Sequence, residues 1–469
     1  MVVRRLNFDR CEAADYIKKT ADLNKDKNKT YHIVTYGCQM NVHDSERLAG
    51  MLEAMGYKKC EDRREADIII FNTCCVRENA ELRLYGNVGA LRELKESRPD
   101  MRIAICGCMM QQPEVAEHIK KRFDFVDIVF GSHNTHSLPK LLFESLMENE
   151  RQFEIIDDAQ TIIENEPVHR DSSFSAWITV GYGCNNFCSY CIVPYVRGRE
   201  RSRCSADIIA EAEKAASNGC VEITLLGQNV NSYGKDCGEI SFAKLLRRLN
   251  EADGIERINF MTSHPKDCSL ELLQAIADCD KVSKQLHLPV QSGSNRILKL
   301  MNRKYTREDY IALAKKAKEI IPGVALTTDI IVGFPGETES DFADTMDLYK
   351  EVGYASAYTF IYSKRNGTPA ARMKEQIPLD VKKERLSRLI ALQSECTAEF
   401  QKRYIGGVYM VLVESVSKRS KKMLSGRTLC GRMVSFPADA SLIGKTVPVR
   451  IIQAKANTLS GVLETEEQT

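Results

Sequence analysis

Three cysteines lie close together near the middle of the chain. Cys184, Cys188 and Cys191 are four and three residues apart, in a short segment with glycine and polar residues. A cubane iron–sulfur cluster has four irons, and each iron is normally held by one cysteine thiolate. A loop with three thiols therefore leaves one iron open to another ligand, and chemistry can take place there.

Two other uses of these thiols fit the spacing less well. Zinc needs a fourth ligand, and its cysteines usually come as pairs two residues apart. A disulfide would leave one thiol unpaired, and 17 cysteines in a long chain without a secretory signal are typical of a reducing compartment. The spacing is similar to that of the radical S-adenosylmethionine enzymes, which implies a [4Fe-4S] cluster whose open iron binds the amine and carboxylate of S-adenosylmethionine.

A second set of thiols lies nearer the N-terminus. Cys38, Cys74 and Cys108 each follow a predicted strand directly and are 36 and 34 residues apart. Because open parallel sheets bind ligands at the carboxyl ends of their strands, these thiols should converge. We expect a second three-cysteine cluster here, rather than inert thiols. Strand geometry alone does not decide between these residues and the neighbouring Cys75 and Cys106.

The strands before these thiols are predicted from apolar runs separated by segments of helical periodicity. The runs are Tyr31–Thr35, Asp67–Asn72, Arg102–Cys106 and Phe125–Phe130, and the helical segments include Ser45–Met55 and Ala80–Lys95. This alternation is typical of a parallel α/β sheet. We predict an α/β domain over 31–150, preceded by a polar leader over 1–30 and followed by a weakly periodic linker over 151–170.

Six more strands are predicted in a domain that spans residues 171–400. They are Ala176–Val180, Glu222–Leu226, Arg257–Met261, Gln285–Leu288, Ala325–Val332 and Ala355–Ile361. A polar or glycine-rich segment follows each strand, and the first such segment holds the three central cysteines. In barrels of parallel strands these loops carry the chemistry. Six repeats predict a partial (βα)6 barrel, open enough to admit a folded nucleic acid.

Polar side chains in these loops are candidates for ligand binding. Those predicted to hydrogen-bond S-adenosylmethionine are Gln228, Asn229, Ser263 and Gln291. Arg197 and Arg199 follow the central cysteines and are predicted to guide an RNA backbone, with an exposed charged edge as the alternative.

A small β-barrel is predicted over residues 401–465 from short strands punctuated by glycine. The strands are Val408–Val413, Met423–Leu424, Met433–Phe436, Thr446–Ile452 and Leu459–Leu463. Residues 401–460 contain eleven Lys and Arg against Glu414 and Asp439. A compact basic barrel favours RNA phosphates, although a single charged run is also compatible with a solvated loop. The predicted RNA contacts are Lys418, Arg419, Lys421, Lys422 and Arg427.

The composition is that of a large globular protein. Hydrophobic residues make up 43% of the 469 residues, and 66 Lys and Arg against 64 Asp and Glu leave a net charge of only +2. The whole-chain charge therefore does not identify a partner. No stretch approaches the roughly 18 apolar residues of a membrane helix, and the leader has no apolar segment, so we expect a cytoplasmic protein with no membrane partner.

Together these features resemble the radical S-adenosylmethionine methylthiotransferases, from Tyr31 to about Leu463. The resemblance rests on Tyr36–Asn41, Asn72–Cys74, Gly107–Cys108, the loop with Cys184, Cys188 and Cys191, and the basic C-terminal barrel. It implies that Cys38, Cys74 and Cys108 hold an auxiliary [4Fe-4S] cluster. It also implies that the C-terminal barrel is an OB-like TRAM domain, a module used for RNA binding.

The resemblance is strongest to members that act on isopentenyladenosine next to the tRNA anticodon. It implies methylthiolation of carbon 2 with two molecules of S-adenosylmethionine: one yields a 5′-deoxyadenosyl radical, and the other methylates a sulfur carried by the auxiliary cluster. Carbon 2 carries an unactivated C–H bond, so the reaction needs a radical cofactor. The base must also reach a buried barrel mouth, which favours a single-stranded loop.

The expected partners are a tRNA anticodon stem-loop, an electron donor such as a flavodoxin and a sulfur donor, and we expect a monomer. Relatives that modify threonylcarbamoyladenosine or a ribosomal-protein aspartate share both cysteine sets and are one alternative, although the basic barrel favours RNA over protein. A noncatalytic RNA-binding iron–sulfur protein is the other. Formation of 5′-deoxyadenosine from S-adenosylmethionine separates an enzyme from that second alternative.

Overall fold

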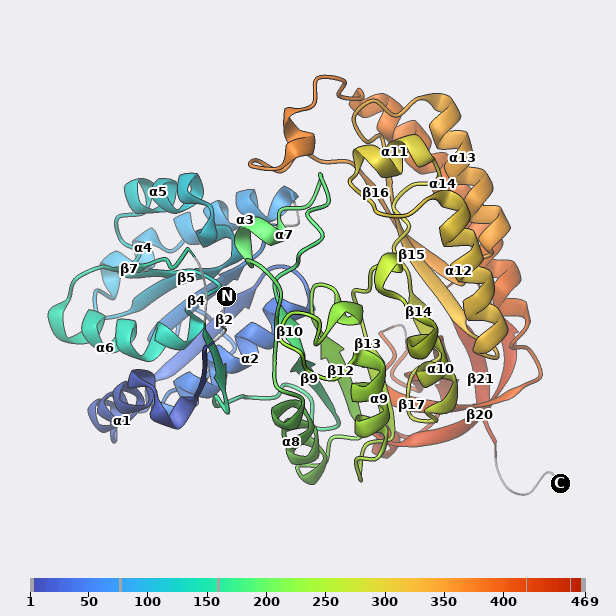
Figure 1. Cartoon of the computed structure of the whole chain (residues 1–469). Coiled ribbons are helices and arrows are strands. Elements are labelled where there is room, and N and C mark those ends of the chain that lie inside the picture. Colours follow the sequence, from blue (N-terminus) through green and yellow to red (C-terminus); the bar gives the residue numbers. More distant parts are fainter. Residues whose placement is uncertain (1–3, 76–77, 158–160, 419, 456, 465–469) are drawn as a thin grey trace. The chain divides into compact units, whose positions relative to one another are not determined.

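The structure is a computed structural model that describes residues 4–75, 78–157, 161–418, 420–455 and 457–464 (Figure 1). The chain forms two compact units. Unit 1 consists of Met1–Ser172, Trp177–Asn185 and Cys191–Glu211. Unit 2 consists of Ser173–Ala176, Asn186–Tyr190 and Ala212–Thr469.

Unit 1 contains a six-stranded parallel sheet with the strand order β3-β2-β4-β5-β6-β7. The strands are β2 (Thr30–Thr35), β3 (Lys58–Lys59), β4 (Ile68–Thr73), β5 (Arg102–Gly107), β6 (Ile128–Phe130) and β7 (Gln152–Glu154). The intervening helices are α2 (Gln39–Ala54), α3 (Glu78–Gly89), α4 (Arg92–Ser97), α5 (Pro113–Arg122) and α6 (Leu138–Glu148). Because the chain passes from β2 to β3 on one side and then to β4 on the other, the topological switch point lies between β2 and β4.

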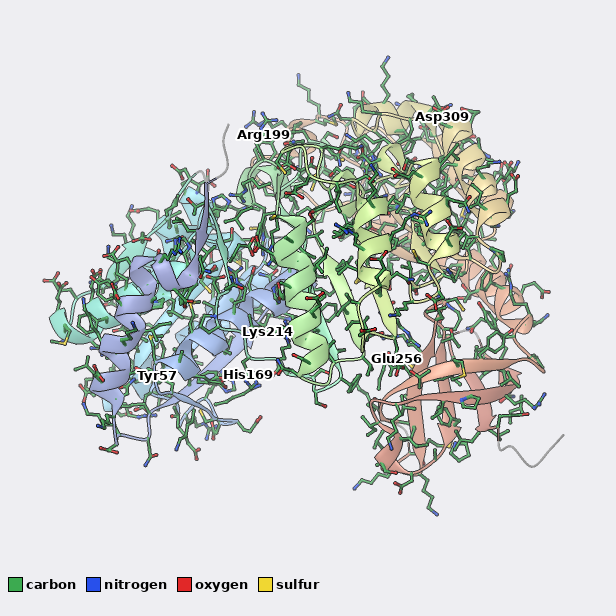
Figure 2. The ribbon with its side chains drawn as sticks, turned by 60° about the horizontal axis from the view of Figure 1, so that its bottom comes forward. Tyr57, His169, Arg199, Lys214, Glu256 and Asp309 are labelled. Atoms are coloured by element: carbon green, nitrogen blue, oxygen red, sulfur yellow. The ribbon has the colours of Figure 1, made fainter. Side chains whose placement is uncertain are left out.

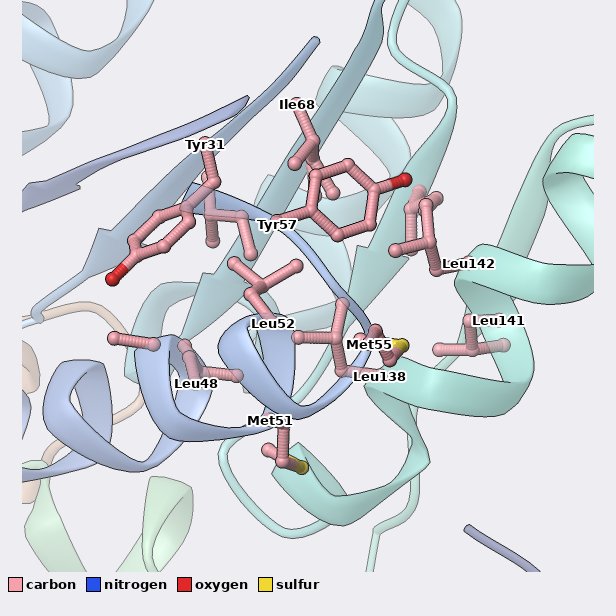
Figure 3. Packing of buried hydrophobic residues seen from close by; sticks show 14 of the residues in the cluster. Tyr31, Leu48, Met51, Leu52, Met55, Tyr57, Ile68, Leu138, Leu141 and Leu142 are labelled. Carbon is pink, nitrogen blue, oxygen red and sulfur yellow. The ribbon is translucent and has the colours of Figure 1, made fainter. Parts of the chain in front are cut away.

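Both faces of this sheet are buried. Ile68 and Ile70 of β4 pack into one hydrophobic cluster, and Ile69 and Phe71 pack into another. Successive side chains of a strand point to opposite faces, which explains the division. Figure 3 shows the first cluster, in which Leu52 of α2 lies among side chains from the sheet and from α6. Burial on both faces explains the nearly continuous apolar runs in the sequence.

The segments predicted as a leader and a linker contain regular structure. They hold β1 (Arg4–Asn7), α1 (Glu12–Asn24), β7 and β8 (Thr161–Glu164). β1 pairs with β8, and Phe8 and Ile17 join the first hydrophobic cluster. The strands were missed because three or four residues are too few to show a period. The predicted domain bounds themselves stay predictions.

The six predicted strands of the central domain are present. They are β9 (Ser175–Thr179), β12 (Glu222–Leu226), β13 (Arg257–Phe260), β14 (Gln285–His287), β15 (Ala325–Val332) and β16 (Ser356–Ile361). They form two sheets with the orders β13-β12-β9 and β14-β15-β16, and a parallel bridge from Ile258 to Val282 connects β13 to the segment before β14. This arrangement confirms the predicted partial barrel.

Helices and short strands complete this region. The helices are α7 (Val193–Val196), α8 (Ser205–Ser217), α9 (Phe242–Asn250), α10 (Leu270–Asp278), α11 (Asn295–Leu300), α12 (Arg307–Ile320), α13 (Glu339–Val352) and α14 (Leu379–Lys402). The short strands β10 (Gly181–Tyr182) and β11 (Arg201–Ser202) form an antiparallel pair. Within the described ranges, no helix combines the length and apolar character needed to cross a membrane.

The C-terminal part of unit 2 is a closed barrel with the strand order β17-β18-β19-β21-β20. Its strands are β17 (Val408–Val416), β18 (Met423–Thr428), β19 (Met433–Pro437), β20 (Thr446–Ala454) and β21 (Leu459–Leu463). Val411, Leu424 and Phe436 belong to its buried core. The hydroxyl of Thr446 donates to Glu256, which Figure 2 labels, at a distance of 2.7 Å. The structure confirms the predicted small β-barrel.

Candidate functional site

The structure places the three N-terminal thiols at the carboxyl ends of neighbouring strands. Cys38, Cys74 and Cys108 follow β2, β4 and β5, and the switch point lies between the first two of these strands. A hydrogen bond from the Cys74 thiol lowers the pKa of Cys38, and this outweighs the opposing effect of burial. Burial raises the pKa of Cys108, which also interacts electrostatically with Cys38. The structure therefore brings these three thiols together.

Two buried asparagines connect the start of α2, just after Cys38, with the end of β4, just before Cys74. The Asn41 amide donates to the side-chain oxygen of Asn72 at 3.2 Å and to the carbonyl oxygen of Thr73 at 3.0 Å. The Asn72 amide donates in return to the carbonyl oxygen of Asn41 at 2.8 Å. These reciprocal bonds fix the start of α2 against the end of β4, and so position the residues next to Cys38 and Cys74. Sequence analysis included both asparagines in the motif but did not find their positioning role.

Gly107 places Cys108 directly after β5. Its φ is +96°, and an added Cβ would lie 2.4 Å from the carbonyl oxygen of Thr73. Substituting alanine should therefore combine backbone strain with an overlap against neighbouring backbone. We expect Gly107→Ala to lower the free energy of unfolding by about 2–4 kcal/mol, measured by urea denaturation.

Gly86 on α3 provides a matched control, because an added Cβ there meets nothing within 4 Å. Gly86→Ala should raise the free energy of unfolding by about 0.5–1 kcal/mol, the usual helix-propensity gain. Equal effects of the two substitutions would contradict the steric explanation for Gly107.

The two rival cysteines occupy different surroundings. Cys106 lies within β5 and packs in the hydrophobic cluster shared with α2 and α6, where burial raises its pKa well above the usual value. Cys75 packs beside Cys108 in a small cluster with Ile192 and Val196. Cys106 therefore faces the hydrophobic core, whereas Cys75 lies next to the set formed by Cys38, Cys74 and Cys108.

The position of Arg197 contradicts its predicted role as an RNA contact. The residue is only 4% exposed, so it is not placed to guide an RNA backbone on the surface. Its Nε donates to the Cys108 Sγ at 3.1 Å, and its Nη2 donates to Asp44 at 2.8 Å. Burial alone would lower the pKa of Arg197, but Asp44 and the thiols raise it well above the usual value. The alternating charges of the sequence did not reveal this contact, because Cys108 is 89 residues away.

The arrangement of the N-terminal thiols fits a polynuclear cluster. Among the residues described, no group of three or more His, Cys, Asp or Glu side chains is arranged to hold a metal ion. In a cubane cluster each thiolate binds a different iron, so the thiolates need not converge on one point. Three thiols at adjacent strand ends, with a buried cation donating to one of them, fit such an electron-rich group.

Separate contacts position the central cysteine loop in each unit. In unit 1, the amide of Cys184 donates to the carbonyl oxygen of Gly198 at 3.1 Å, next to the paired strands β10 and β11. In unit 2, the side chain of Asn302 donates to the carbonyl oxygen of Phe187 at 2.8 Å, and the hydroxyl of Ser189 donates to the carbonyl oxygen of Leu300 at 2.8 Å. The last residue of α11 and the turn after it thus hold the residues on both sides of Cys188.

A second buried arginine lies against this loop. Arg303 is 7% exposed, and its Nη1 donates to the Cys188 Sγ at 3.4 Å. Its other contacts include the Tyr305 hydroxyl at 2.8 Å and the Pro289 carbonyl oxygen at 2.6 Å. The two cysteine sets therefore share one feature, a buried guanidinium that donates to a sulfur.

Hydrogen bonds connect the loops that carry the predicted cofactor-binding residues. The amide of Val230, next to Asn229, donates to the carbonyl oxygen of Thr262 at 3.0 Å, and the Ser263 hydroxyl donates to the carbonyl oxygen of His287.

Two of these residues show features expected of a polar site. The Asn229 amide donates to Asp267 at 2.7 Å, whereas its side-chain oxygen is buried without a partner among the described residues. The side-chain nitrogen and the side-chain oxygen of the nearby Asn231 are also buried without a hydrogen-bond partner among the described residues. Gln291 has a φ of +72° and joins β15 through its backbone. These unpaired amide atoms fit a polar ligand. Gln228 is partly buried in the same loop as Asn229.

Apart from the buried Arg197, the predicted RNA contacts are exposed where they are described. Lys418, Lys421 and Lys422 lie in the loop between β17 and β18. Arg427 on β18 pairs with Glu414 at 3.1 Å. Arg199, labelled in Figure 2, is also exposed. Arg419 lies outside the described residues.

Three family models match the chain. Residues 178–349 match the Radical SAM superfamily, and residues 30–131 match the Uncharacterized protein family UPF0004. Residues 402–463 match the TRAM domain. The first region includes β12 to β15 of the partial barrel, the second includes β2 to β6 of the N-terminal sheet, and the third includes all five strands of the closed C-terminal barrel.

Curated relatives are similar over almost the whole chain. A protein from Acetivibrio thermocellus named tRNA-2-methylthio-N(6)-dimethylallyladenosine synthase is 57% identical over 93% of this chain and 91% of its own length. A protein of the same name from Alkaliphilus oremlandii is 57% identical over 96% of this chain and 95% of its own length. The chain belongs to this synthase family. The family shares the radical methylthiotransferase character that the cysteine pattern predicts.

A solved structure supports the fold. The radical S-adenosylmethionine methyltransferase TsrM from Kitasatospora setae matches with a TM-score of 0.53 and 14% identity. The match covers 73% of this chain and 75% of TsrM. At this identity the likeness concerns the fold alone.

Proposed function

We propose that this synthase-family member methylthiolates carbon 2 of dimethylallyladenosine, also called isopentenyladenosine, in tRNA. The observation that carries the proposal is the meeting of Cys38, Cys74 and Cys108 at a sheet switch point, in a chain that also has the loop with Cys184, Cys188 and Cys191. Two three-thiol sets match the two halves of the reaction, which are opening a C–H bond and delivering sulfur. The identity of 57% to synthases of this name supports the same substrate.

The cofactors are S-adenosylmethionine and [4Fe-4S] clusters. When bound, they supply the one-electron chemistry and the methyl group that protein side chains lack. We assign one cluster to each three-cysteine set, and S-adenosylmethionine to Gln228, Asn229, Ser263 and Gln291. The unpaired side-chain oxygen of Asn229 supports this assignment, because a buried carbonyl oxygen without a donor costs free energy that a bound amine would recover.

The RNA partner follows from the family and from the basic barrel. We place the anticodon stem-loop against Lys418, Lys421, Lys422 and Arg427, with Arg199 as a further contact and Arg419 retained from the sequence. The remaining partners in the proposal are an electron donor such as a flavodoxin and a sulfur donor. We further propose a monomer that acts in the cytoplasm, where tRNA is modified.

A nucleoside digest of tRNA tests the substrate. A strain that lacks the gene should lose 2-methylthio-isopentenyladenosine and accumulate isopentenyladenosine, and the wild-type gene should restore the product. Persistence of the methylthio nucleoside, or loss of a methylthio threonylcarbamoyladenosine instead, would overturn the substrate assignment.

The basic loop should contribute strongly to tRNA affinity. We expect Lys418→Glu, Lys421→Glu and Lys422→Glu in one variant to weaken tRNA binding at least about tenfold at 0.1 M salt, because three phosphate contacts are lost. The slope of log affinity against log salt should fall by about 2–3. Filter binding across a salt series measures both quantities.

A control with the same change in charge distinguishes the loss of local phosphate contacts from the effect of the total charge. Lys214→Glu, Lys244→Glu and Lys350→Glu make the same charge change on exposed positions of α8, α9 and α13. An equal loss of affinity in this control would mean that total charge, and not the loop, determines binding.

A further inference from the structure

One buried arginine donates a hydrogen bond to a sulfur in each cysteine set. The distances are 3.1 Å from Arg197 Nε to Cys108 Sγ and 3.4 Å from Arg303 Nη1 to Cys188 Sγ. Burying a guanidinium is costly unless nearby groups compensate for its lost hydration. In each case a cysteine sulfur belongs to that compensation.

The two arginines differ in how their charges are balanced. Arg197 forms an ion pair with Asp44 at 2.8 Å, and both side chains are about 5% exposed or less. The hydrogen-bond partners described for Arg303 are all neutral or sulfur groups: Tyr305, Tyr190, Pro289 and Cys188. The charge of Arg303 is therefore less neutralised locally than that of Arg197.

This difference matters for a redox group, because reduction adds one negative charge. A nearby cation, or a donor to a coordinating sulfur, stabilises the reduced form and raises the reduction potential. The effect falls when a carboxylate neutralises the cation. The same kind of contact should therefore act more strongly at Cys188 than at Cys108.

We propose that Arg303 and Arg197 separately set the reduction potentials of the clusters held by the two cysteine sets, with the larger effect from Arg303. Arg303 raises the reduction potential of the cluster held by Cys184, Cys188 and Cys191. Arg197 raises the potential of the auxiliary cluster by less, because Asp44 partly neutralises its charge. Both are positioning residues that act through a thiolate ligand. The inference rests on the proposed assignment of one cluster to each set.

Single-cluster backgrounds allow each arginine to be tested alone. Arg303→Met is made in the Cys38→Ala, Cys74→Ala, Cys108→Ala background, and Arg197→Met and Asp44→Asn in the Cys184→Ala, Cys188→Ala, Cys191→Ala background. Dithionite supplies one electron to the cluster, and electron paramagnetic resonance measures its reduced fraction at each potential.

We expect a larger shift from Arg303→Met than from Arg197→Met. Arg303→Met should lower the equilibrium constant for one-electron reduction about tenfold, which equals about 59 mV. Arg197→Met should lower it about threefold, and Asp44→Asn should raise it, because the charge of Arg197 then acts without its carboxylate.

Buried arginines that contact other groups serve as controls. Arg102→Lys in unit 1 and Arg385→Lys in unit 2 replace arginines bonded to Ser145 and to Glu337, and should leave both potentials unchanged. Unchanged potentials in Arg303→Met and Arg197→Met would overturn the inference. Arg303→Lys and Arg197→Lys are made as charge-retaining variants. Loss of the cluster from both the Met and the Lys variant of either arginine would also overturn the inference, because the residue would then be needed for assembly. If the backgrounds themselves do not each lose one cluster, the proposed function fails instead.

Discussion

Alanine at Cys184, Cys188 and Cys191 together is expected to abolish 5′-deoxyadenosine formation. The iron content should fall from about eight to about four atoms per chain, because one cubane loses all three thiolate ligands. Sulfide should fall in parallel. The measurement is anaerobic quantitation of iron and sulfide, with chromatography of the products formed from S-adenosylmethionine under dithionite.

Cys237→Ala is the control, since Cys237 is an exposed thiol in the same unit as Cys188. It should retain both clusters and full 5′-deoxyadenosine formation. Retention of both clusters by the triple variant would overturn the cluster assignment. Failure of the wild-type protein to form 5′-deoxyadenosine would favour a noncatalytic iron–sulfur protein that binds RNA.

The second large effect is expected from alanine at Cys38, Cys74 and Cys108. This variant should also lose about four irons, yet it should still form 5′-deoxyadenosine, because the central loop is intact. Methylthio product should fall below about 1% of the wild-type amount, since removal of a group that acts as a unit abolishes its step. The two triple variants thus separate radical formation from sulfur delivery.

The neighbouring thiols provide a stringent control for this variant. Cys75→Ala and Cys106→Ala each remove a thiol within two residues of a proposed ligand, and both should keep about eight irons. Loss of four irons from Cys75→Ala would move the ligand assignment to that residue. Loss of 5′-deoxyadenosine from the N-terminal triple variant would contradict the division of labour.

Most strands were predictable because each carries its own signal. β15 is predicted and observed over the same residues, Ala325–Val332, where six of the eight residues are buried and five are apolar. β7 and β8 were missed, because strands of three and four residues are too short to show a period. Their strand character depends on the partners they pair with, which are distant in the sequence.

The sequence by itself predicted the chemistry of the central loop. Cys184, Cys188 and Cys191 lie within eight residues, so their grouping does not depend on how the rest of the chain folds. It also predicted that Cys38, Cys74 and Cys108 follow strands of one parallel sheet, because apolar runs mark those strands.

Only the tertiary structure decided which groups surround the sulfurs. Arg197 contacts Cys108 across 89 residues, and Arg303 contacts Cys188 across 115. The sequence pattern around Arg197 was equally compatible with a surface charge, because a charge pattern does not report burial. Contacts of this kind depend on strand order and on packing between distant segments, which local patterns do not encode.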